Sequence, residues 1–78
     1  MNISEAIAKR IEILCKEKGI SVNKLATLSG LTQSTIDSIL KGKSRNPRIA
    51  TIRKLCDGLD ISLTEFLEDP IIKTADYD

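Results

Sequence analysis

The most constraining feature of this chain is a very short connection between two helical segments. Helical periodicity predicts one helix at Val22–Ser29 and another at Gln33–Lys41, with little more than the sequence SGLT between them. A link this short makes the two helices cross sharply. Gly30 supplies the residue that tolerates positive φ in the turn, and Ala26 is small enough to let the two backbones approach. The spacing therefore predicts a helix-turn-helix.

Helical patterns also cover the rest of the chain, and no stretch alternates convincingly like a strand. Apolar stripes predict further helices at Ile3–Lys18, at Ile49–Asp57 and over a short segment that Ser62 caps. Asn2 is expected to cap the first helix, in a capping box with Glu5. Four glycines each follow a helical run and are expected to end it: Gly19, Gly30, Gly42 and Gly58. The sequence therefore predicts an all-α fold of five helices.

The length of 78 residues suits one small domain. A hydrophobic fraction of 41% supports a core, and an aromatic fraction of 3% predicts a core made mostly of Ile and Leu. We expect the domain to occupy residues 1–68 and a C-terminal tail to occupy residues 69–78. Two alternatives remain for the tail, which is either loosely ordered or an interface arm carrying Ile71, Ile72 and Tyr77.

Several classes of protein are disfavoured by what the chain contains. No apolar run approaches transmembrane length, and the N-terminus lacks the pattern of a signal peptide, so we expect a cytoplasmic protein without a membrane partner. Cys15 and Cys56 without any His make a poor zinc site, and we expect both thiols to be buried and free of a disulfide. With no catalytic motif, no enzyme activity, cofactor, metal or small-molecule ligand is expected.

Charge is unevenly distributed along the chain, although the net charge is only +1. Six basic and no acidic residues lie between Lys41 and Lys54, whereas seven acidic residues and only Lys73 follow from Asp57 onward. This asymmetry indicates one face for a polyanion and another facing away. Ordinary solvated charge is the alternative explanation.

The segment Val22–Lys41 resembles the helix-turn-helix of the phage repressor and Cro family, also called the Xre family. The matching residues are Leu25, Ala26, Gly30, Leu31, Ile36 and Ile39. The segments LKGKSRNP and LCDGLDISLTEFL match as well, so the resemblance covers about Ile3 to Leu67. It implies a five-helix, lambda-repressor-like DNA-binding domain that regulates transcription, most simply as a repressor.

The resemblance also implies which residues meet double-stranded DNA. The helix at Gln33–Lys41 would lie in the major groove, and its base-reading residues would be Gln33, Ser34, Thr35 and Ser38. Gln33 is the strongest candidate, because its amide can pair bidentately with adenine. Phosphate contacts would come from Ser21, Thr32, Lys41, Lys43, Ser44, Arg45 and Arg48. These residues would fix the register of the protein on the duplex.

The chain departs from the family pattern at several positions. Val22 stands where many members have a phosphate-binding Gln. Cys15 and Leu40 replace an Arg–Glu pair, an exchange of ions for apolar groups that need not weaken the fold. Asp37 lies in the reading helix, where phosphate repels it. It either faces sideways toward the following loop or accepts a hydrogen bond from cytosine N4.

One reading helix contacts few base pairs, so a homodimer on a twofold operator is expected, with the fifth helix and the tail at its interface. A second hypothesis comes from a different class: the same fold serves as a protein-interaction module, such as an antitoxin or a regulatory partner. The near-zero net charge and the acidic tail favour this alternative. A steep salt dependence of DNA binding would argue against it.

Overall fold

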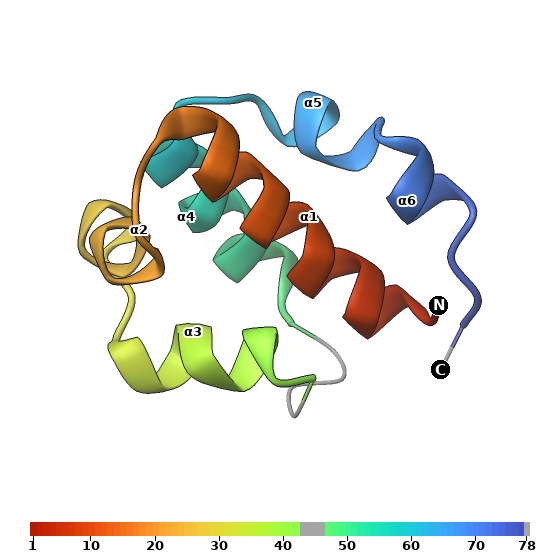
Figure 1. Ribbon diagram of the computed structural model, residues 1–78, viewed down its shortest axis with the longest axis horizontal. Coiled ribbons are helices and arrows are strands. Elements are labelled where there is room, and N and C mark those ends of the chain that lie inside the picture. The colour runs from red at the N-terminus through yellow and green to blue at the C-terminus, as the bar shows by residue number, and fades with distance from the viewer. Residues whose placement is uncertain (43–46, 78) are drawn as a thin grey trace.

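The computed structural model describes residues 1–42 and 47–77, and Figure 1 shows their arrangement. The helices in these residues are α1 (Ile3–Lys18), α2 (Val22–Ser29), α3 (Gln33–Leu40), α4 (Ile49–Leu59), α5 (Leu63–Leu67) and α6 (Pro70–Lys73). Within these ranges there is no strand, and no helix is long and apolar enough to cross a membrane. The predicted all-α class is confirmed, but the predicted number of five helices is wrong.

The additional helix, α6, lies in the segment that was predicted to be a tail. Asp69 caps it by accepting a hydrogen bond from the backbone N–H of Ile71 at 2.9 Å, and Pro70 occupies its first turn. A helix of a single turn is too short to show periodicity in the sequence. Beyond α6, the backbone of Asp76 pairs with the start of the chain. Its carbonyl accepts a hydrogen bond from the N–H of Ile3 at 2.8 Å, and its N–H donates to the carbonyl of Met1 at 3.0 Å.

Two predicted helix ends also differ from the structure. Helix α3 ends at Leu40, one residue early, with Lys41 as its C-cap. Helix α4 runs to Leu59, so Gly58 lies inside the helix and does not end it. Asp60 takes the left-handed conformation after α4 instead, with φ of 56°. Asp is one of the few residues other than Gly that adopt this conformation readily.

Gly58 lies where α4 packs closely on α2. A Cβ at this position would collide with Ser29 Oγ, and it would lie 3.1 Å from both Leu25 Cδ1 and the Ser29 nitrogen. Glycine is therefore needed here for the approach of two helices.

The core lies where α1 packs against α4, with α2 and α3 on one side of this pair and α5 and α6 on the other (Figure 1). Its largest fully buried side chains are Phe66, Ile11, Leu25, Ile36, Leu55, Leu59 and Cys56. The predicted Ile and Leu core is thus confirmed. Cys15 is buried as well, and both thiols are free.

Arg10 is a buried charge that sequence analysis did not single out. Its side chain is only 9% exposed and forms an ion pair with Asp69 at 3.2 Å. It also donates to the carbonyl oxygens of Phe66 at 3.2 Å and Glu65 at 3.0 Å. Its guanidinium lies 6.0 Å from the centre of the Phe66 ring. One side chain of α1 therefore holds α5 and the start of α6 in place.

The chain leaves α1 and α4 through the same pattern of local backbone hydrogen bonds. After each helix, an apolar residue donates a backbone hydrogen bond to a buried cysteine: Ile20 to the Cys15 carbonyl and Ile61 to the Cys56 carbonyl, both at 3.0 Å. A left-handed residue precedes the apolar residue and a serine N-cap follows it, namely Gly19 and Ser21 after α1 and Asp60 and Ser62 after α4. Each pattern ends one helix, packs a partly buried apolar side chain against the core and starts the next helix.

Candidate nucleic-acid interface

The turn between α2 and α3 is built from local hydrogen bonds. Gly30 has φ of 69°, and the N–H of Leu31 donates to the Ala26 carbonyl at 3.0 Å. Thr32 then caps α3 by accepting from the N–H of Thr35 at 3.1 Å. Because Ile36 is fully buried, the orientation of α3 about its own axis is set by the core. The predicted sharp link is therefore present, and it leaves one face of α3 in solvent.

The residues predicted to read bases differ in how accessible they are. Gln33 and Ser34 are exposed, whereas Thr35 and Ser38 are partly buried. The Thr35 hydroxyl also shares a hydrogen bond of 2.9 Å with the Thr32 hydroxyl. The first turn of α3 therefore offers Gln33 and Ser34 most freely, and Thr35 contributes to the cap.

Asp37 contacts Gln33. The Gln33 Nε2 donates a hydrogen bond of 2.9 Å to Asp37 Oδ1, one helical turn further along α3. The Asp37 side chain is partly buried beside this contact. The sequence predicted either the following loop or cytosine as the partner of Asp37, so the contact with Gln33 was not foreseen. The i, i+4 spacing was the available signal, since residues with this spacing are neighbours on a helix surface.

The predicted phosphate-binding residues form two groups in the structure. Ser21 and Thr32 are N-cap residues whose hydroxyl oxygens each accept from a backbone N–H, at 3.0 Å from Lys24 and 3.1 Å from Thr35. Lys41, the C-cap of α3, and Arg48, the N-cap of α4, are exposed basic residues. Arg48 makes no side-chain hydrogen bond as the N-cap of α4. Lys43, Ser44 and Arg45 lie outside the described residues.

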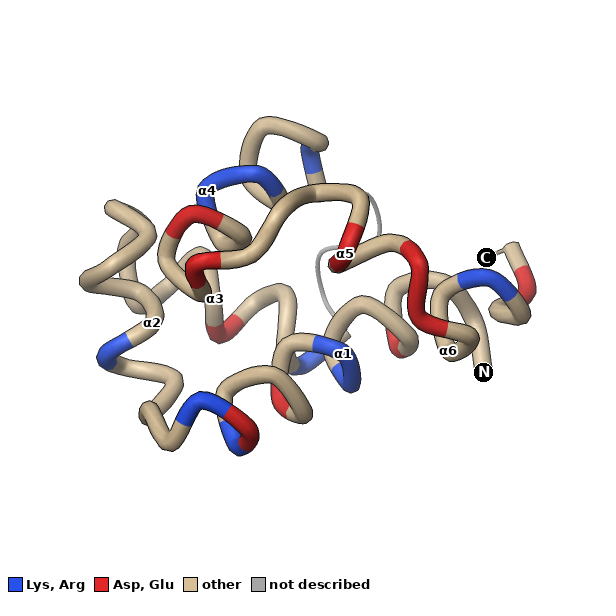
Figure 2. Tube along the Cα trace, turned by 90° about the horizontal axis from the view of Figure 1, so that it is seen from above, with Lys and Arg blue, Asp and Glu red and all other residues tan. Residues whose placement is uncertain are grey.

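Acidic residues recur along the chain from the end of α4 to the start of α6, and others lie on α1 and α3 (Figure 2). Helices α5 and α6 lie on the opposite side of α1 from α3 (Figure 1). Glu68 in this region pairs with Lys73 at 2.8 Å, and this ammonium group lowers the pKa of the Glu68 carboxyl. The acidic residues of α5 and of its junction with α6 therefore lie away from α3, whereas α1 and α3 carry acidic residues of their own.

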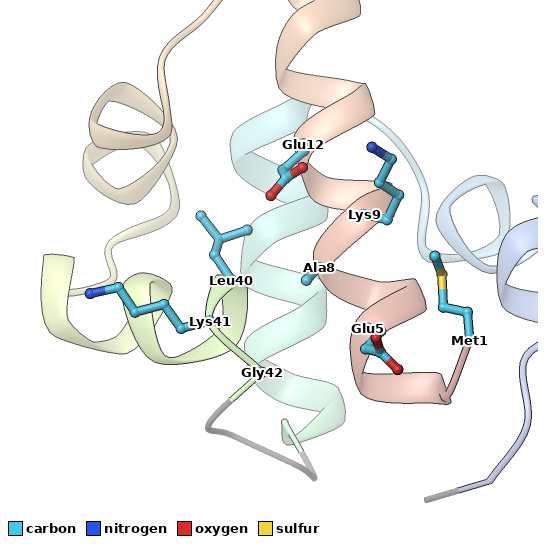
Figure 3. A pocket seen from close by; sticks show the side chains of 8 residues that line it. All are labelled: Met1, Glu5, Ala8, Lys9, Glu12, Leu40, Lys41 and Gly42. Atoms are coloured by element: carbon cyan, nitrogen blue, oxygen red, sulfur yellow. The ribbon is translucent and has the colours of Figure 1, made fainter.

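A shallow pocket of about 320 Å³ lies between α1 and the end of α3 (Figure 3). Its lining residues are Met1, Glu5, Ala8, Lys9, Glu12, Leu40, Lys41 and Gly42. Leu40 comes from the position where the family pattern has an acidic residue, and it packs against the core. The residues that line the pocket carry charges of both signs.

Comparisons with known proteins agree with this geometry. Residues 10–70 match the Cro/C1-type HTH DNA-binding domain. The chain is 38% identical over 65 residues to the HTH-type transcriptional regulator PuuR of Escherichia coli, covering 83% of this chain and 35% of that protein. It is 35% identical over 63 residues to the HTH-type transcriptional regulator SinR of Bacillus subtilis, covering 81% of this chain and 57% of that protein.

Solved structures show the same fold. Prophage Lp1 protein 11 superposes with a TM-score of 0.79 and 37% identity, covering 86% of this chain and 88% of that one. An HTH_3 family transcriptional regulator from Vibrio cholerae gives a TM-score of 0.78 and 30% identity, covering 88% of this chain and 38% of that one. The chain spans only part of these relatives, 35% of the length of PuuR and 57% of the length of SinR. The fold, the turn and the sequence matches together show that this chain belongs to the Cro/C1-type helix-turn-helix DNA-binding family.

Proposed function

We propose that this protein binds double-stranded DNA sequence-specifically and regulates transcription, acting as a repressor in the cytoplasm. The observation that carries the proposal is the first turn of α3. There, Gln33 and Ser34 are exposed while Ile36 and Ile39 fasten the same helix to the core. This is what a reading helix in the major groove requires: polar groups at base edges on a rigid support.

Base reading is assigned to Gln33 and Ser34, with Thr35 and Ser38 as further members of the reading set. The amide of Gln33 can donate to adenine N7 and accept from adenine N6. The hydroxyl of Ser34 can bond either kind of base edge and so discriminates less.

We assign phosphate binding to residues at the ends of helices. The N–H groups at the start of α2 and α3 favour an anion, and the Ser21 and Thr32 hydroxyls can donate to phosphate while they cap. Lys41 and Arg48 add positive charge in solvent. Lys43, Ser44 and Arg45 are proposed from the sequence to complete the set.

A homodimer is part of the proposal, with its contacts on α5 and the C-terminal segment. Leu67 and Tyr77 are 36% and 96% exposed on this side of the molecule. A twofold dimer would place two α3 helices one turn of DNA apart, so the operator would carry inverted half-sites.

The testing experiment is selection of bound duplexes from a random library by the purified protein at moderate salt. An enriched motif with inverted half-sites is the expected result. A single ungapped motif would retain sequence-specific binding and contradict the symmetric dimer. If the folded protein enriches nothing, the DNA proposal is wrong and a protein-interaction module becomes the better hypothesis, which capture of a protein partner would test.

The salt dependence of DNA affinity provides a second test of the proposal. Binding through phosphates releases counterions, so the logarithm of the affinity should fall linearly with the logarithm of salt concentration. A flat dependence would contradict the assigned phosphate contacts even if a motif is found.

A further inference from the structure

Asp37 is an acidic side chain in the helix that we propose to enter the major groove. DNA phosphates repel it, so its presence needs a compensating role. Its carboxylate accepts a hydrogen bond of 2.9 Å from the amide nitrogen of Gln33. Its own backbone is held within α3, where its carbonyl accepts from the N–H of Lys41 at 2.9 Å. The Asp37 side chain is therefore attached to a rigid helix and touches the foremost candidate for base reading.

The chemistry of this contact determines which way the Gln33 amide faces. A carboxylate only accepts hydrogen bonds, so it can hold the NH₂ end of the Gln33 amide and repels the Oε1 end. A flip of the amide would bring two acceptors together. Asp37 thus selects one of the two orientations that Gln33 could otherwise adopt.

The selected orientation leaves a defined set of groups for the base. One Nε2 proton is used in the hydrogen bond to Asp37, so the second Nε2 proton and the Oε1 acceptor remain for a base in the major groove. Adenine presents one acceptor, N7, and one donor, N6, which match this set. Guanine presents two acceptors, N7 and O6, which would need both amide protons. A Gln33 amide held by Asp37 fits adenine and opposes guanine.

We propose that Asp37 is a positioning residue that makes Gln33 select adenine over guanine. This inference rests on the proposed function, since it concerns how the same reading helix discriminates. It differs from direct recognition of cytosine by Asp37, because here the carboxylate acts through Gln33.

The test begins by locating the base pair that Gln33 reads. Selected motifs of the wild type and of Gln33→Ala are compared, and the position that loses its preference in Gln33→Ala is the one tested. Two duplexes that differ only there, with adenine or guanine, are then titrated by fluorescence anisotropy. A good bidentate pair predicts that the wild type prefers adenine by roughly 5- to 150-fold.

Three substitutions of Asp37 separate orientation from charge. Asp37→Ala and Asp37→Asn should each lower the adenine-to-guanine ratio by about 2- to 12-fold, the range that one net hydrogen bond supports. Both remove a negative charge and should also raise affinity for the two duplexes together, a change that cancels in the ratio. Asp37→Glu keeps an acceptor-only group and should retain most of the preference. Thermal unfolding of each variant checks that it is folded.

The double variant Gln33→Ala, Asp37→Ala decides whether Asp37 acts through Gln33. Removing Asp37 from the Gln33→Ala protein should leave the ratio unchanged. The inference is overturned if Asp37→Ala and Asp37→Asn keep the wild-type ratio, or if the loss is equally large without Gln33. A lost preference for cytosine would instead assign Asp37 to direct reading. In each of these cases the wild-type motif remains, whereas absence of any wild-type motif would overturn the proposed function as well.

Discussion

Among the residues that we propose to bind phosphate, Arg48 is a helix N-cap whose side chain does not cap the helix. It is the N-cap of α4, it is exposed, and its side chain makes no capping hydrogen bond. Ser21 and Thr32 use their hydroxyls to cap helices. Substitution of either would remove a cap together with any phosphate contact. Arg48 therefore allows the cleanest test of phosphate binding.

We expect Arg48→Ala to weaken DNA binding by a similar factor for every sequence, because phosphate contacts carry no sequence information. The slope of log affinity against log salt should fall by about one unit. Titration at several salt concentrations measures this slope. An unchanged slope in Arg48→Ala would remove Arg48 from the phosphate set.

Among the helices, α2 and α4 make the closest approach at Gly58. Alanine in place of glycine within a helix is usually stabilising by about 1 kcal/mol. Here the added Cβ would collide with Ser29 Oγ. That hydroxyl is itself buried and has no hydrogen-bond partner in the part of the chain that the structure describes.

We expect Gly58→Ala to lower the free energy of unfolding by about 1–2 kcal/mol, because overpacking outweighs the gain in helix propensity. Urea denaturation measures the change. The double variant Ser29→Ala, Gly58→Ala should recover part of the loss, since it removes one colliding atom and leaves the Ser29 nitrogen in place. A stabilised Gly58→Ala protein would show that the two helices separate without cost.

The attachment of α5 and α6 to α1 depends on Arg10. Arg10→Ala would leave Asp69 and two carbonyl oxygens without their donor. We expect this change to cost about 1.5–3 kcal/mol of stability, the range for hydrogen bonds to a charged group. Lys9→Ala, which alters an exposed neighbour on α1, should change stability by about 0.5 kcal/mol or less.

Urea denaturation compares these two variants, and hydrogen exchange locates the effect of Arg10→Ala. Amides at the end of α6, such as that of its C-cap residue Thr74, should exchange faster when Arg10 is removed. Equal stability of the two variants would contradict the role given to Arg10.

At the scale of the whole molecule, the two buried thiols link stability to pH. Burial raises the pKa of both Cys15 and Cys56 above the ordinary value of 9.0. Near that pH the unfolded chain releases thiol protons that the folded chain still holds. The folded state therefore binds more protons, and stability falls as pH rises. The contribution is complete below pH 9.0 and is lost as pH rises through the raised folded values.

Denaturant midpoints measured from pH 7 to pH 10 test this linkage. Other groups titrate in the same range, so the informative quantity is the difference between the wild type and Cys15→Ala, Cys56→Ala. The double variant should lose less stability than the wild type over the upper part of the range. Parallel curves would show that the thiols ionise equally in both states.

The sequence predicted where the proposed base-reading residues lie in the fold, but it did not predict their contacts. The helix-turn-helix spacing placed Gln33 and Ser34 at the start of α3, where the structure exposes them. The bond between Gln33 and Asp37 depends on two side-chain conformations, which spacing permits without requiring.

The sequence alone determined local features, namely the residues at which helices begin and the side chains that cap them. Asn2 and Ser62 cap the helices that they were predicted to cap, because an N-cap depends on atoms only three residues apart. The tertiary structure decided what depends on distant atoms. Gly58 lies inside a helix because α2 passes beside it, and α6 is held because Arg10 reaches Asp69. No local pattern encodes either contact, since the partners meet only after the core has formed.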